Sequence, residues 1–212
     1  MRRKITKFVV FIAIIVFFII KKGYFGTSNI IVIDPGHGGH DPGTIGINGT
    51  YEKDINLEIS KKLYEKLKSM GYKVVLTRKT DESVDNIFRA KLANRKRARV
   101  FVSIHCNALE DNNSTNGIQI LYYPNRKGCA NDPDNEVLAN LVLEQALIST
   151  SAENKGIVER EDLIVLNQTK MPAIIVECGF LSNGSEASLL IDDEYQNMVV
   201  DGIVEGLRNY IK

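Results

Sequence analysis

The sequence predicts an α/β fold, a single-domain sandwich with a mixed, mostly parallel central sheet and helices on both faces. Short β-branched runs alternate along the chain with longer amphipathic segments, as where Asn29–Asp34 precedes Glu52–Met70. The composition, 44% hydrophobic and 25% charged, is that of an ordinary globular protein, and 212 residues suit one medium domain. The sequence contains no internal repeat or low-complexity tract.

The individual elements follow from residue spacing. Asn29–Asp34 ends in a Pro-Gly turn, which suits a buried strand that leads into a loop. Apolar residues recur at helical spacing through Glu52–Met70, and Gly71 then ends the pattern like a C-terminal cap. The other predicted strands are Tyr72–Thr77, Arg99–His105, Gly117–Tyr123, Asp162–Leu166 and Ala173–Glu177, and the other predicted helices are Val84–Arg97, Asn135–Ser149 and Asp193–Tyr210.

Residues 1–25 are predicted to be a hydrophobic signal or anchor segment, and residues 26–212 one folded domain. A basic start precedes thirteen unbroken apolar residues, Phe8 to Ile20. As a helix this stretch reaches about 20 Å, against roughly 30 Å of hydrocarbon, so it is nearer to a signal-peptide core than to a full span. An Ala-x-Ala type cleavage site is missing after Ile20, which favours an uncleaved anchor. We therefore expect an exported, extracytoplasmic protein that meets the membrane through this segment.

The charge of the chain argues against a nucleic-acid partner. The formal net charge of the chain is +1, and residues 1–22 alone contribute +6, so residues 23–212 have a net charge of −5. A domain that binds nucleic acid usually carries a basic surface instead. One basic run remains in the domain, and we interpret it as a solvated helix face, although it could also meet an anionic glycan or a membrane surface. This run consists of Arg89, Lys91, Arg95, Lys96, Arg97 and Arg99.

Three cysteines are too few for a disulfide framework, and their spacing matches no Cys-x-x-Cys metal site. Cys106 and Cys178 each follow a candidate site residue on a strand, so their side chains should point to the opposite face, into the core. Cys129 lies in a Gly/Asn/Asp/Pro-rich stretch and is a candidate exposed thiol.

Two of the three histidines, His37 and His105, end apolar strands, a placement that suggests a metal site. A catalytic zinc usually takes three protein ligands and keeps a fourth position open, and Glu52 at the start of a helix is a candidate third ligand. A first-turn carboxylate is also commonly a simple capping contact, and spacing alone leaves both interpretations open. His40 is interpreted as an exposed loop residue.

Five segments in this order resemble the zinc-dependent N-acetylmuramoyl-L-alanine amidases and together cover residues 29–212. The segments are Ile33-Asp-Pro-Gly-His-Gly-Gly-His-Asp-Pro-Gly43, Tyr51-Glu-Lys-Asp54, Leu76-Thr-Arg78, Ser103-Ile-His-Cys-Asn107 and Pro172-Ala-Ile-Ile-Val-Glu-Cys-Gly-Phe-Leu-Ser-Asn183. The resemblance implies that His37, Glu52 and His105 bind Zn²⁺ and that Glu177 is catalytic. Cys106 departs from the family, where alanine is usual, and Arg97-Ala-Arg99 stands where Ala-Asp is more common.

The implied reaction is hydrolysis of the amide bond between the lactyl group of N-acetylmuramic acid and L-alanine in peptidoglycan. Glu177 would accept a proton from the attacking water and pass it to the departing amine. Asp34 could orient His37 or only stabilise the turn, and both interpretations stay open. Tyr122 and Tyr123 could contact sugar, although strand aromatics more often serve packing.

Within the family, the short hydrophobic N-terminus, the single catalytic domain and Leu121-Tyr-Tyr-Pro-Asn125 resemble the spore-cortex amidases, whose action precedes muramic-δ-lactam formation and germination. The expected partner is a peptidoglycan glycan strand with its stem peptide, with an accessory protein for targeting or zinc loading as a further candidate. Alternatives are a general cell-wall autolysin or cell-separation amidase, another zinc hydrolase such as a peptidase, and a non-catalytic wall-binding homologue. The intact Glu177 argues against the last.

Overall fold

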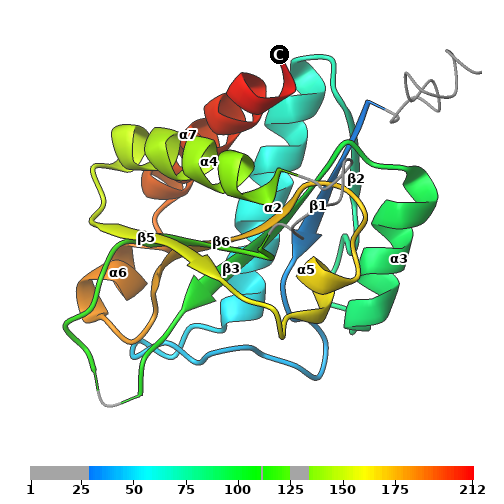
Figure 1. The fold of residues 1–212 in the computed structure, drawn as a ribbon. Coiled ribbons are helices and arrows are strands. Elements are labelled where there is room, and N and C mark those ends of the chain that lie inside the picture. The colour runs from blue at the N-terminus through cyan, green and yellow to red at the C-terminus, as the bar shows by residue number, and fades with distance from the viewer. Residues whose placement is uncertain (1–28, 111, 125–133) are drawn as a thin grey trace, which may run out of the picture.

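The structure, a computed structural model, describes residues 29–110, 112–124 and 134–212 (Figure 1). Its strands are β1 (Ile30–Pro35), β2 (Lys73–Leu76), β3 (Val100–Asn107), β4 (Ile118–Tyr122), β5 (Asn154–Glu159) and β6 (Ala173–Phe180). Its helices are α2 (Glu52–Ser69), α3 (Asn86–Lys96), α4 (Asn135–Thr150), α5 (Ile164–Asn167), α6 (Gly184–Leu189) and α7 (Asp193–Ile211).

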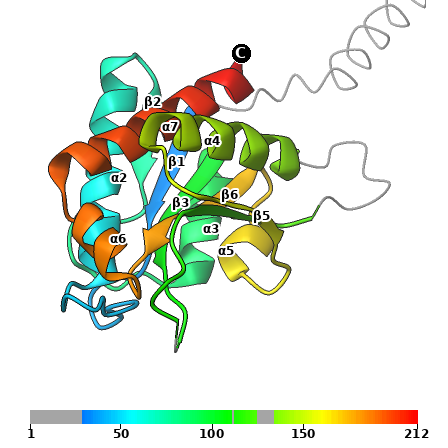
Figure 2. The ribbon, with the colours of Figure 1, turned by 90° about the vertical axis from the view of Figure 1, so that its left-hand side faces the viewer.

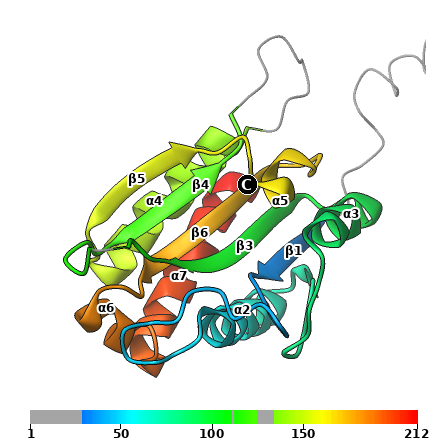
Figure 3. The same cartoon turned by 90° about the horizontal axis from the view of Figure 1, so that it is seen from below.

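The strands form one sheet in the order β2-β1-β3-β6-β4-β5. All neighbours are parallel except β4 and β6, which run antiparallel, so the predicted mixed, mostly parallel sheet is confirmed. Figure 3 shows β5, β4, β6, β3 and β1 side by side. Because β1, β3 and β6 run the same way, their carboxyl ends meet at one edge of the sheet, and loops at such an edge commonly form binding sites.

Helices cover both faces of the sheet, as predicted (Figure 2). On one face, apolar residues of α2, α4 and α7 share a core with alternate strand residues such as Val102 and Ile104. On the other face, the smaller α3 and α5 cover Val32, Phe101 and Ile175. This period-two division of strand residues is what a sheet buried on both sides requires.

Two parts of the fold differ from the sequence prediction. The expected strand Asp162–Leu166 is wrong, because Ile164–Asn167 forms the short helix α5. Its apolar run is too short for periodicity to separate strand from helix. The edge strand β5 and the short helix α6 were not predicted, and β5 is only partly buried and contains Gly156 at φ 76°, so it lacks the usual alternation.

Helix α3 begins at Asn86, two residues later than predicted, because the Asp85 side chain caps it by accepting from the backbone N–H groups of Ile87 and Phe88. Cys106 and Cys178 are buried in the core, as predicted. Cys129 and the predicted segment 1–25 lie outside the described residues. Among the helices in the described ranges, none has the length and apolar character needed to cross a membrane.

Candidate metal centre

Four predicted site residues come from the carboxyl-end edge of the sheet and the start of α2. His37 follows the end of β1, and His105 and Glu177 lie near the ends of β3 and β6. Glu52 is the first residue of α2, and its backbone N–H donates to the carbonyl oxygen of Thr44 in the preceding loop. The topology therefore gathers residues that are up to 140 positions apart in the chain.

His37, Glu52 and His105 form a cluster that could hold a metal ion, with one ligand atom from each within 4.8 Å of the others. Glu52 Oε1 lies 3.2 Å from His37 Nε2 and 2.9 Å from His105 Nδ1. Two ligands that each lie 2.0–2.1 Å from a tetrahedral zinc are about 3.3 Å apart. The two imidazole rings are edge to face, with centroids 4.8 Å apart. The donor set and its spacing therefore fit a divalent cation.

The Glu52 carboxylate is buried and fixed by several donors. Its Oε2 accepts from the backbone N–H of Thr44 at 2.8 Å, and its Oε1 accepts from the backbone N–H of Cys106 at 3.1 Å. Burial alone would raise the pKa of Glu52, but the hydrogen bonds with His105 and His37 outweigh it and hold the pKa well below its usual range. Glu52 is therefore an anion aimed at both imidazoles, which goes beyond a simple capping contact.

His37 adopts an unusual backbone conformation, with φ at 59° in the left-handed region. Its Nδ1 donates to Asp41 Oδ2 at 2.7 Å, which leaves Nε2 facing Glu52. Burial opposes a charge on His37, but the bonds to Glu52 and Asp41 raise its pKa to about 9. Without a metal, the negative charges around His37 thus favour a proton on its imidazole. The same charges would favour a bound metal cation.

Asp41, and not Asp34, is the carboxylate that orients His37. The sequence left the orienting role of Asp34 open, but Asp34 turns inward and accepts from Thr77 Oγ1, Ser103 Oγ and Arg89 Nη1. A carboxylate four residues after a histidine on the same glycine-rich loop was the signal that could have identified Asp41.

His105 lies directly over Gly36. A Cβ built on Gly36 would be 2.2 Å from His105 Nε2, far inside any possible contact. The absence of a side chain at Gly36 is therefore what allows the turn after β1 and the imidazole of β3 to lie against each other.

Glu177 is buried, with 8% of its surface exposed, and its Oε2 has no hydrogen-bond partner. Burial raises the pKa of Glu177 to about 7, with the nearby Glu52 charge acting in the same direction and His105 opposing it. Its strand neighbours in register are His105 and Gln119. A carboxylate that can hold or release a proton near neutral pH suits general acid–base chemistry.

The candidate metal cluster does not include four other residues that the sequence singled out, namely His40, Tyr122, Tyr123 and Arg89. His40 is exposed, as expected. Tyr122 is buried in the core and its hydroxyl donates to Glu159 Oε1, and Tyr123 packs against the α3/α5 face, so both serve packing. The solvated interpretation of Arg89 is wrong, because it is 2% exposed and bonded to the turn that carries His37.

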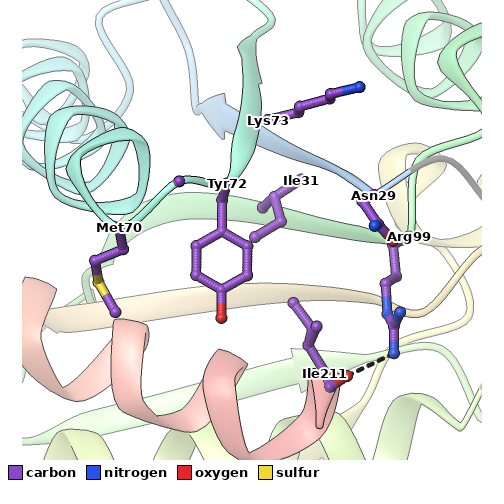
Figure 4. Close-up of a pocket in the computed structure, with 8 residues that line it drawn as sticks. Asn29, Ile31, Met70, Tyr72, Lys73, Arg99 and Ile211 are labelled. Atoms are coloured by element: carbon purple, nitrogen blue, oxygen red, sulfur yellow. Dashed lines mark hydrogen bonds between the residues drawn. The ribbon is translucent and has the colours of Figure 1, made fainter.

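A separate cavity of about 310 Å³ lies at the opposite ends of β1 and β2 (Figure 4). Its lining includes Ile31, Met70 and Tyr72, and Arg99 Nη2 donates to the carbonyl oxygen of Ile211 across one side. None of the predicted site residues lines this cavity. The candidate metal centre is therefore distinct from this cavity.

An α/β fold with a His/Glu/His cluster, beside a buried carboxylate whose Oε2 has no hydrogen-bond partner, is typical of hydrolases that use a single metal ion. Comparison with known proteins narrows the class. The chain belongs to the N-acetylmuramoyl-L-alanine amidase family, whose model matches residues 31–209. It is accordingly an enzyme with peptidoglycan amidase activity.

Solved structures and a curated relative agree with this family. An N-acetylmuramoyl-L-alanine amidase from Clostridium difficile 630 is 38% identical, with a TM-score of 0.81 over 88% of this chain and 98% of that one. The CwlD amidase from Clostridioides difficile, solved in complex with the GerS lipoprotein, is 32% identical, with a TM-score of 0.74 over 87% and 98%. The germination-specific N-acetylmuramoyl-L-alanine amidase of Bacillus subtilis is 31% identical over 87% of this chain and 80% of its own length.

Proposed function

We propose that the protein uses a Zn²⁺ held by His37, Glu52 and His105 to hydrolyse the lactyl–L-alanine amide of peptidoglycan, with Glu177 as general base and acid. The observation that carries this proposal is the buried Glu177 carboxylate, whose Oε2 lacks a partner, next to a cluster with zinc-like donor spacing. A bound Zn²⁺ supplies Lewis-acid polarisation of the carbonyl and lowers the pKa of a water.

The residues of the chain perform the remaining chemistry. Glu177 accepts a proton from the attacking water on its free oxygen and then donates it to the amine of the departing L-alanine. Asp41 holds His37 in the tautomer that presents Nε2, and Glu52 stays anionic. The products are a muramic acid carboxylate and a stem peptide with a free amino terminus.

Product analysis tests the proposal. Purified protein is incubated with peptidoglycan with and without a chelator, and the fragments are separated and sequenced by mass spectrometry. We expect chelator-sensitive release of peptides that begin with L-alanine, together with glycan strands that carry free lactyl carboxylates. Cuts between amino acids would instead identify a peptidase, and absence of any cleavage by metal-loaded protein would favour a wall-binding homologue.

For the biological role, we propose preparation of spore cortex for muramic-δ-lactam formation. The germination-specific relative and the resemblance of Leu121–Asn125 to spore-cortex amidases support this assignment. Loss of muramic-δ-lactam from the cortex of a deletion strain is the expected result. Normal lactam content with unseparated daughter cells would favour the alternative role of a general autolysin or cell-separation amidase.

We further propose that residues 1–25 export the protein and hold it at the membrane, and that an accessory protein assists targeting or zinc loading. Support for the second point comes from the similar CwlD amidase, which was solved with a lipoprotein. Cell fractionation tests the first point, and a cytoplasmic location would contradict it. If the purified protein alone binds one equivalent of zinc tightly and is fully active, no accessory protein is needed for loading.

A further inference from the structure

Two buried guanidinium groups hold the turn that carries His37. Arg78 donates from Nε to the carbonyl oxygen of Pro35 at 3.0 Å and from Nη2 to that of Gly36 at 2.8 Å. Arg89 donates from Nη1 to the carbonyl oxygen of Pro35 at 2.6 Å and from Nη2 to that of His37 at 2.7 Å. Three consecutive backbone carbonyls therefore accept from arginine side chains, and 1% of Arg78 and 2% of Arg89 is exposed.

Arg89 is itself fixed from two directions. Its Nη1 also donates to Asp34 Oδ1 at 2.8 Å, and its Nε donates to the carbonyl oxygen of Val84 at 3.0 Å. Asp34 is buried and accepts in addition from Ser103 Oγ at 2.7 Å. Because a guanidinium is planar and permanently charged, acceptors on several sides determine its orientation. Arg89 thus links α3 to the end of β1.

This linkage matters because the backbone of His37 is strained. With φ at 59°, His37 has a left-handed conformation that is unfavourable for a non-glycine residue and persists only where the surroundings hold it. Arg89 holds the carbonyl oxygen of His37 itself, whereas Asp41 and Glu52 contact the two ring nitrogens of its imidazole. Backbone and ring of His37 are therefore each fixed by their own partners.

We propose that Arg89 is a positioning residue of the metal centre, which keeps the His37 imidazole directed at Glu52 and His105 through the His37 carbonyl. This inference rests on the proposed function, because it assumes that His37 binds the metal. It explains why one arginine of a basic run is buried while Lys91 and Arg95 on the same helix are exposed.

The test compares the metal affinity of Arg89→Lys with that of wild type in the full-length protein. A lysine ammonium lacks the planar fork that reaches Asp34 and two carbonyl groups together. We expect zinc affinity, measured by competition with a chromogenic chelator, to fall by about 10- to 100-fold. The visible spectrum of the Co²⁺-substituted variant should also change, since it reports ligand geometry. Lys91→Met, an exposed change on the same helix, should leave both unchanged.

Two further variants separate positioning from general destabilisation. Val142→Ala removes buried volume from α4, away from the metal centre, and should lower the melting temperature but keep wild-type zinc affinity. Asp34→Asn removes the charge that Arg89 Nη1 contacts, so it should also weaken zinc binding. If Arg89→Lys does not fold, the zinc affinity of Asp34→Asn tests the positioning role instead. Absence of zinc binding by wild type would contradict the proposed function. Wild-type affinity and cobalt spectra in the folded Arg89 or Asp34 variant would overturn this inference.

Discussion

His105 on β3 and Glu177 on β6 are neighbours in register on adjacent parallel strands. Side chains at paired positions lie on the same face of a sheet. Cys106 and Cys178 each come one residue later, so they lie on the other face, in the core beneath α2, α4 and α7. The sheet itself therefore fixes the candidate base relative to one candidate metal ligand. Relative placement by rigid strands is what proton transfer at a metal centre requires.

Glu177→Gln should bind zinc like wild type but lose turnover by about 10²–10⁴-fold, because the amide keeps the shape of the side chain and cannot accept the water's proton. Release of stem peptides from peptidoglycan measures turnover, and metal analysis measures binding. Glu153→Gln, an exposed change, serves as the control. A rate within a few-fold of wild type would remove Glu177 from the mechanism.

The metal-free protein should lose stability as the pH rises from about 4.5 to 7. Burial raises the pKa of Glu177 to about 7 in the folded state, so in this range the folded protein keeps a proton that the unfolded chain has released. The loss amounts to about 3 kcal/mol above this window. Glu177→Gln should lack this component. Urea unfolding in chelator at pH 5 and pH 8 measures the difference, and equal pH dependence in both proteins would contradict the prediction.

Gly36→Ala should disrupt the metal centre. The new Cβ would lie 2.2 Å from His105 Nε2, so the imidazole, whose Nδ1 contacts Glu52, must leave its observed position. We expect zinc affinity to fall at least about 10-fold, as for other losses of ligand orientation. Gly184→Ala is the matched control, because its Cβ would meet nothing nearer than Ile47 at 3.9 Å. Unchanged affinity in Gly36→Ala would show that His105 is not needed in its observed position.

Asp41→Ala should weaken zinc binding by about 10- to 100-fold, since loss of the hydrogen bond at His37 Nδ1 frees the ring to rotate and lowers its basicity. Chelator competition measures the affinity. Asp54→Ala removes an exposed carboxylate of α2 without touching His37, so it should keep wild-type affinity. Equal affinities in the two variants would contradict the orienting role of Asp41.

The sequence predicts the sheet class and the gathering of His37, His105 and Glu177, because apolar strands with polar ends are visible in local patterns. It does not predict β5, because this edge strand is partly exposed and lacks the period-two alternation of apolar residues. It does not predict α5 either, because four residues are too few to show a helical period. The burial of Arg89 could not be predicted either, because its acceptors are the carbonyl oxygens of Pro35 and His37, which are distant in the sequence. Local patterns reveal the elements, and tertiary contacts decide the supporting residues.

The central claim, that one zinc held by His37, Glu52 and His105 works together with Glu177, is tested most directly by one titration. Zinc is added to chelator-stripped wild type and to Glu177→Gln, and bound metal and peptide release from peptidoglycan are measured in the same samples. The account predicts that wild-type activity rises linearly until one equivalent of zinc has been added and then stays constant. The variant should bind one equivalent of zinc and stay inactive. Full activity of the stripped wild type, or matching activity of the two zinc-loaded proteins, would contradict it.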